Sequence, residues 1–202
     1  MPRKQIRKTN TNAALSAAFW KLYMKKPVSE ITIKELTLEA GVHRSSFYGH
    51  YDDIYALLEY NEQQLLDGIT SYMDFSSLTG DSRSPIDMIV RFYQENLHKL
   101  SVLMGDHGDP GFIIRFKEQV IPCVLEHMAI PRDNKKCYYI IDFIVSSMLT
   151  FLTSWYLNEG SMPPENIIKY IRSAIMNGCA APLSESTNDI EAFRRFFTIC
   201  RS

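Results

Sequence analysis

Apolar residues recur at helical spacing along almost the whole chain, and this periodicity constrains the fold more than any other feature. The first series repeats at i, i+1, i+4 and i+5, as one buried helix face requires, and consists of Ala14, Leu15, Ala18, Phe19, Leu22 and Tyr23. Ile31-Thr32-Ile33 is the one candidate strand, and no alternating partner follows it. The pattern therefore predicts an all-α protein.

Local signals divide the first quarter of the chain into three helices. The first ends before Pro27, and Thr32 with Glu35 three residues later forms a capping-box pattern that begins the second. Gly41 suits the left-handed turn that ends this helix, because glycine adopts that geometry without steric cost. A short third helix is expected between His43 and Gly49, and the acidic pair Asp52-Asp53 is well placed to begin a long fourth helix.

The remainder predicts a larger helical bundle. Pro85 suits the first turn of a helix that reaches about Met104, after a polar loop at 76–85. Further helices are expected at about 112–128 with a kink near Pro122, at 134–158, and from Pro163 to about 178. A final helix at 188–200 carries Ile190, Phe193, Phe196 and Phe197. We therefore predict two domains, residues 1–51 and 52–202.

Composition narrows the class of protein. The 202 residues are 46% hydrophobic and 22% charged, as in ordinary globular proteins. The four cysteines form no CxxC pair and no Cys/His cluster, so neither a zinc module nor a disulfide scaffold is indicated. No apolar run follows the basic N-terminal residues, so we expect no secretory signal and a cytoplasmic protein.

The charge is divided unevenly along the chain. Residues 1–51 contain nine Lys or Arg and three Glu, a formal charge of 9 − 3 = +6, whereas the rest contains 13 basic and 20 acidic residues, 13 − 20 = −7. A basic first quarter indicates either a small module that faces a polyanion or a solvated basic tail.

Three short helices with a glycine turn between the second and third are typical of a helix-turn-helix, whose third helix enters the major groove of DNA. A reading helix needs short polar side chains and a guanidinium on its exposed face, because base edges are recognised there by hydrogen bonds. Val42, Phe47 and Tyr51 are spaced to face inward, which leaves the polar side chains of Arg44, Ser45, Ser46 and Tyr48 outward.

The same segment resembles a known family. The residues Thr32-Ile33, Leu36, Ala40-Gly41-Val42, Arg44, Phe47-Tyr48 and His50-Tyr51 are similar to the N-terminal signature of TetR/AcrR transcriptional regulators. The resemblance implies a homodimer that binds a palindromic operator in double-stranded DNA, commonly as a repressor, with a ligand pocket in the C-terminal domain. It also implies that Arg44, Ser45, Ser46 and Tyr48 meet bases or phosphates, that Lys34 reaches base or backbone, and that His50 lies at the phosphates.

Two positions depart from the family pattern. His43 stands where the family often has serine, a better N-cap. Ile54 stands where a phosphate-binding lysine is common, and it follows Asp52 and Asp53. These departures favour modest DNA binding, or binding that depends on the basic N-terminal residues Arg3, Lys4, Arg7 and Lys8.

Aromatic and methionine side chains are frequent between residues 88 and 157, where they either line an apolar pocket or fill the core. With the resemblance, this composition predicts a site for a small hydrophobic or amphipathic ligand. Asp142 and Ser146 share a helix face with Thr150 and either orient that ligand or bond within the bundle. The candidate ligand-binding residues are Phe92, Phe116, Tyr139, Asp142, Phe143, Ser146, Phe151 and Trp155.

Other classes of function have weaker support. Tyr138–Leu157 is long enough to span a bilayer, but Asp142 and five hydroxyl residues favour a buried bundle helix and no membrane partner. His107 between Asp106 and Asp109 is a poor metal site, and no nucleophile motif indicates an enzyme or a cofactor. A co-regulator that acts through a protein partner, and an enzyme with an apolar pocket, remain the alternatives.

Overall fold

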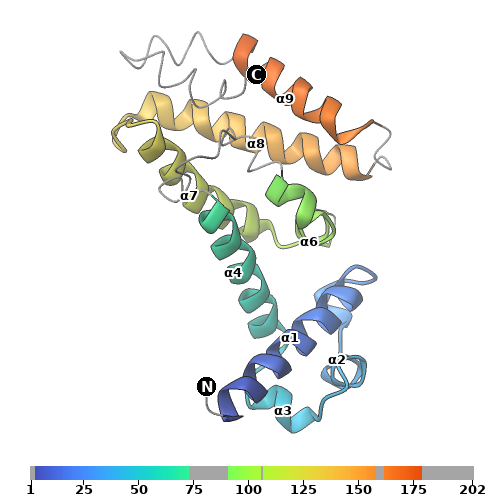
Figure 1. Cartoon of the computed structure of the whole chain (residues 1–202). Coiled ribbons are helices and arrows are strands. Elements are labelled where there is room, and N and C mark those ends of the chain that lie inside the picture. The colour runs from blue at the N-terminus through green and yellow to red at the C-terminus, as the bar shows by residue number, and fades with distance from the viewer. Residues whose placement is uncertain (1–2, 73–90, 106, 158–161, 179–202) are drawn as a thin grey trace. The chain divides into compact units, whose positions relative to one another are not determined.

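The computed structural model describes residues 3–72, 91–105, 107–157 and 162–178, and every regular element within these ranges is a helix. The prediction of an all-α fold is therefore confirmed. The described chain forms two compact units (Figure 1). The first contains residues 1–65 and 102–109, and the second contains residues 66–101 and 110–202.

The first unit is built on α1 (Arg3–Tyr23), α2 (Ile33–Glu39), α3 (Arg44–Tyr48) and the start of α4 (Ile54–Tyr72), with a 3-10 turn η1 at Val28–Glu30. Its core is apolar and fully enclosed: Leu15, Phe19, Leu36, Phe47 and Leu57 are each 0% exposed. Burial of such side chains stabilises the unit by about 1.5–3 kcal/mol each. The face predicted for α1 is thus the buried one, except that Ala14 is half-buried.

The helix ends of the first unit follow the sequence signals. The Thr32 hydroxyl oxygen accepts a hydrogen bond from the Glu35 amide at 3.2 Å, which is half of the predicted capping box. The Asp53 carboxylate accepts from the Ala56 amide at 2.9 Å and caps α4. Gly41 ends α2 with φ +64°, the left-handed conformation predicted for it.

The second unit contains α7 (Pro110–His127), α8 (Lys135–Leu157) and α9 (Pro164–Gly178), and α6 (Leu97–Leu103) runs from this unit into the first. α7 and α8 pack against each other along their apolar faces. The buried residues of α8 include Ile141, Val145 and Leu152. By length and composition alone, α8 could cross a membrane. One face of α8 is buried, however, as a helix of a bundle requires.

One predicted helix is interrupted. The sequence pattern predicts a continuous helix from Pro85 to about Met104, but the helical residues 91–95 are separated from α6 by a turn at Asn96. The Asn96 side chain donates to the Phe92 carbonyl at 3.0 Å, and asparagine side chains compete in this way with the helical backbone. Residues 73–90, which include the predicted loop and Pro85, lie outside the described residues, as does the predicted helix at 188–200.

The two compact units do not divide the chain at the predicted domain boundary between residues 51 and 52. α4 continues from the first unit into the second, and residues 102–109 belong to the first unit although they are distant in sequence. The functional division into 1–51 and 52–202 stays a prediction.

Replacing Gly41 by alanine should destabilise the protein. An L-residue at φ +64° costs about 1–2 kcal/mol, and because no atom lies within 4 Å of the added Cβ, the cost is conformational rather than steric. Gly49→Ala is the matched control, since Gly49 has φ −77° and its Cβ would make ordinary contacts at 3.5 Å. Urea unfolding should show the free energy of unfolding lowered for Gly41→Ala alone. Equal losses in the two variants would contradict this account.

Candidate nucleic-acid interface

α2, the Gly41 turn and α3 form the local framework of the site. The Val42 amide donates to the Thr37 carbonyl at 3.0 Å, which fixes the turn against the end of α2. α3 has only five residues, and its Phe47 side chain is fully buried in the core of the first unit. Tyr51 is also buried, whereas Val42 is half-buried. The inward face predicted for this segment is therefore confirmed for Phe47 and Tyr51.

The opposite side of α3 is open to solvent. Arg44, Ser45 and Tyr48 are exposed, and Ser46 is half-buried. Lys34 on α2 is exposed, and His50, just after α3, is half-buried beside the Tyr51 ring. Four of the predicted DNA-binding residues therefore lie on one short helix, α3: Arg44, Ser45, Ser46 and Tyr48.

Arg44 and Tyr48 are in direct contact on this face. The Arg44 Nη2 atom donates a hydrogen bond to the Tyr48 hydroxyl at 3.1 Å, and the guanidinium carbon lies 5.5 Å from the centre of the tyrosine ring. Both geometries are attractive, since a cation near the face of an aromatic ring is favoured by about 0.5–1 kcal/mol at an exposed site. These contacts therefore favour one arrangement of the guanidinium over the others.

Two lysines of the basic first quarter are paired with acidic residues. Lys21 forms an ion pair with Glu39, and Lys26 Nζ lies 2.6 Å from a carboxylate oxygen of Glu35. The hydrogen bond from Lys21, together with its charge, lowers the pKa of Glu39. Glu35 and Glu39 are already subtracted in the +6 formal charge of residues 1–51, so the pairs leave that charge unchanged, but they make Lys21 and Lys26 less available to an outside anion.

The departures from the family pattern have structural reasons. Ile54 is 8% exposed and belongs to the core, so this position contributes to packing rather than to charge. Asp53 is engaged in capping α4, and His43 precedes α3 as an N-cap whose side chain makes no capping bond. The side chains of Arg3, Lys4, Arg7 and Lys8 lie outside the described residues.

A loop that is distant in sequence completes the first unit. The Tyr23 hydroxyl donates to the His107 carbonyl at 3.2 Å, which joins α1 to the segment 102–109. Burial, with the charges of Glu62 and Asp109, raises the pKa of Tyr23 to about 12, so the hydroxyl keeps its proton at neutral pH. Sequence reasoning missed this contact and considered His107 only as a metal ligand. Among the described residues no cluster of three potential metal ligands is present.

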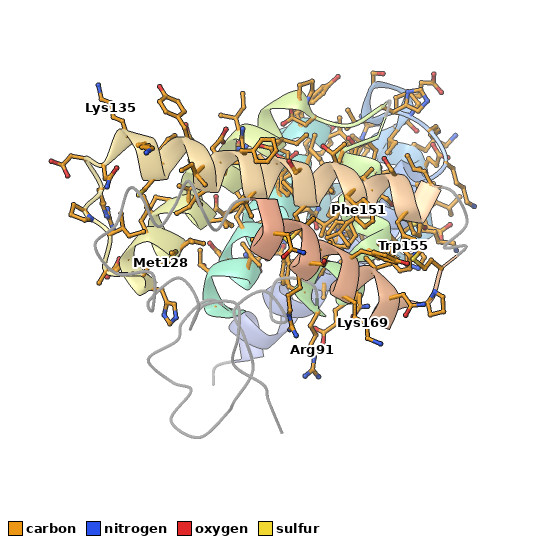
Figure 2. The ribbon with its side chains drawn as sticks, turned by 90° about the horizontal axis from the view of Figure 1, so that it is seen from above. Arg91, Met128, Lys135, Phe151, Trp155 and Lys169 are labelled. Atoms are coloured by element: carbon orange, nitrogen blue, oxygen red, sulfur yellow. The ribbon has the colours of Figure 1, made fainter. Side chains whose placement is uncertain are left out.

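The second unit contains an apolar groove of about 770 Å³ between α8 and α9. Its walls repeat at helical spacing, from Phe143, Ser147 and Phe151 on α8 and from Tyr170, Ala174 and Gly178 on α9. Figure 2 shows Phe151 and Trp155 on the part of α8 that lies beside α9. The Trp155 indole donates to the Met162 carbonyl at 2.9 Å, which ties the end of α8 to the start of the α9 segment.

The groove brings together two of the eight predicted ligand-binding residues. Phe143 and Phe151 line the groove, but Phe92 and Phe116 are each 3% exposed and fill the core, while Tyr139 is 68% exposed. Trp155 does not line the groove either.

Asp142 and Ser146 take the second of the two roles left open by the sequence, since both bond within the bundle. Lys117 Nζ on α7 lies 2.9 Å from an Asp142 carboxylate oxygen and 3.4 Å from the Ser146 hydroxyl. These two residues therefore connect α7 to α8 and are not among those that line the groove.

Comparison with known proteins identifies the class of the second unit. Residues 82–177 match the family model TetR_C_8, described as a transcriptional regulator C-terminal region. This segment covers the described helices from residue 91 through α8 and all but the last residue of α9. A search of curated proteins found no match.

Two solved structures share the fold. A TetR-family transcriptional regulator from Streptomyces coelicolor superposes with a TM-score of 0.66 at 14% identity, covering 100% of this chain and 92% of its own. A TetR transcriptional regulator from Streptococcus agalactiae 2603V gives a TM-score of 0.57 at 25% identity, covering 83% of this chain and 94% of its own.

The family match lies mostly in the second unit, with residues 102–109 in the first, and the fold match to the Streptomyces coelicolor structure covers the whole chain. Regulators of this family generally bind DNA, function as dimers and are not enzymes. Together, the comparisons support the assignment of this chain to the TetR family of transcriptional regulators.

Proposed function

We propose that this regulator binds a palindromic DNA operator as a homodimer, represses transcription, and responds to a small hydrophobic or amphipathic ligand. The observation that carries the proposal is the exposed polar face of α3, with Arg44, Ser45 and Tyr48 on a helix anchored by the buried Phe47. One such helix fits the major groove, where hydrogen-bond donors and acceptors distinguish base pairs. Lys34 and His50 are assigned to contacts with base or backbone.

The groove between α8 and α9 supports the homodimer. Its rim exposes Phe143 and Tyr170, at 62% and 58%, and apolar surface of this kind is a common sign of a protein contact. Small residues at the exposed positions Ser147, Ala174 and Gly178 permit close approach of another helix. A second copy placed symmetrically would bring the same two helices against its partner and cover the groove.

Ligand response is the remaining part of the proposal. The groove volume of about 770 Å³ lies within the roughly 300–1,000 Å³ of typical ligand sites, and its walls are almost wholly apolar. A ligand held between two subunits would favour one separation of the two α3 helices over another. Operator binding requires the two α3 helices to match the spacing of successive major grooves, about 34–36 Å. A ligand that favours another separation would shift the population of dimers away from this spacing and release the DNA.

A second candidate function is a co-regulator with weak DNA binding that acts through a protein partner. The buried Ile54 and the paired Lys21 and Lys26 favour it, because Ile54 supplies no cation and the two lysines already have acidic partners. Capture of a second regulator by the purified full chain in the absence of DNA, together with no sequence-specific DNA binding, would support this alternative over the first.

Replacing Arg44 by alanine should weaken operator binding by about 1–3 kcal/mol, because a base contact from the reading helix is lost. The full chain and the variant would be titrated against the DNA upstream of its own gene and against an unrelated duplex, over a range of salt concentrations. Arg132→Ala is the control, since Arg132 is an exposed residue of the second unit paired with Glu126. Unchanged operator affinity in Arg44→Ala would exclude α3 as the reading helix.

A charge placed in the groove should separate the subunits. Phe151→Glu and Ala174→Glu each put a carboxylate into a surface that dimerisation would bury, so the dimer dissociation constant should rise about 100-fold or more. Sedimentation equilibrium on the full chain would measure it. Ile114→Glu is the matched control, because Ile114 is a 57% exposed apolar residue on α7 that does not line the groove. Equal dissociation in all three variants would contradict this interface.

A further inference from the structure

The contact between Arg44 and Tyr48 indicates which base the protein recognises. This inference rests on the proposed function. Arg44 is the first residue of α3, and Tyr48 lies one turn later. In a helix-turn-helix, the N-terminal residues of the reading helix are the ones that contact base edges. Within the described part of the chain no carboxylate pairs with Arg44, in contrast to Lys21 and Lys26. Its guanidinium is therefore available to an external acceptor, while its contact with Tyr48 favours one position.

The tyrosine ring is itself supported by the core. The Tyr48 ring meets the Phe47 ring edge to face, with centroids 5.4 Å apart and an angle of 85° between the planes. Phe47 is fully buried, whereas Tyr48 is 49% exposed. A continuous path of contacts thus runs from the core through Phe47 and Tyr48 to the Arg44 guanidinium. Because these contacts already restrict the rotamers of Arg44, this side chain loses less conformational entropy on binding than an unrestricted exposed arginine does.

The chemistry of a fixed guanidinium selects one base. The Arg44 guanidinium has five N–H groups, of which one donates to the Tyr48 hydroxyl. The other four remain for a base. Guanine presents two acceptors, O6 and N7, to the major groove, so it accepts two parallel hydrogen bonds from arginine. Adenine presents N7 beside an N6 amino donor, which opposes the second N–H group.

We propose that Arg44 and Tyr48 form one reading unit that recognises a guanine in each operator half-site, with Arg44 in contact with the base and Tyr48 as the positioning residue. Tyr48 acts through Arg44 by holding its guanidinium plane, and its effect on sequence preference depends on the presence of Arg44.

The test begins with the purified full chain and a library of duplexes with a randomised core. Wild type should select a guanine at one position of each half-site. Replacement of that guanine by adenine, or by 7-deazaguanine, which lacks the N7 acceptor, should weaken binding roughly 5- to 150-fold. Arg44→Lys keeps the charge but loses the planar guanidinium that can bond Tyr48 and both guanine acceptors together, so it should lower this discrimination with the salt dependence unchanged.

A double-mutant cycle isolates the role of Tyr48. Tyr48→Phe retains the ring and removes the hydroxyl, so it should lower the preference for guanine about two- to fivefold, close to the effect of one ordinary hydrogen bond. In an Arg44→Ala background the same change should have no effect. Tyr55→Phe is the matched control, because Tyr55 is a 52% exposed tyrosine at the start of α4. Thermal unfolding of each variant would confirm that the fold is kept.

Three results would overturn the proposal in distinguishable ways. If Arg44→Lys or Arg44→Ala weakens binding equally for all sequences, Arg44 contacts a phosphate instead of a base. If Tyr48→Phe has the same effect with and without Arg44, Tyr48 contacts DNA independently. If wild type selects no sequence and binds DNA only weakly, the proposed DNA-reading function fails as well.

Discussion

The burial of Phe47 is the contact on which the candidate interface depends. α3 has five residues, and isolated helices shorter than about 12–15 residues are marginal in water. Its position is therefore set by tertiary contacts, of which the fully enclosed Phe47 side chain is the strongest, together with the hydrogen bond from the Val42 amide to the Thr37 carbonyl. Arg44, Ser45 and Tyr48 are exposed in a defined direction because the opposite side of this short helix is fixed in the core.

Features that arise within a few residues of sequence could be predicted. The Thr32 cap, the Gly41 turn and the Asp53 cap all depend on neighbours no more than a turn away. Backbone geometry and helical spacing alone decide them, so the all-α class and the exposed face of α3 follow from sequence pattern.

Features that depend on distant partners could not be predicted. Lys21 meets Glu39 eighteen residues later, Tyr23 meets the His107 carbonyl 84 residues later, and Lys117 pairs with Asp142 across two helices. The ligand-binding residues stay a prediction, but their positions could not be foreseen for a related reason. Aromatic residues fill cores as readily as pockets, and only packing distinguishes the buried Phe92 and Phe116 from Phe143 and Phe151 in the groove.

The distribution of charge in the first unit bears on the kind of DNA binding proposed. Attraction to the phosphate backbone is independent of sequence and grows with the number of cations that meet phosphates. Pairing of Lys21 and Lys26 and burial of Ile54 limit that contribution from the described residues, whereas Arg44, in contact with Tyr48, presents a guanidinium on α3. An interface of this composition depends more on contacts to base edges than on general attraction to DNA. Because base contacts distinguish one duplex from another and phosphate contacts do not, a regulator built this way would combine modest total affinity with a high ratio of specific to non-specific binding.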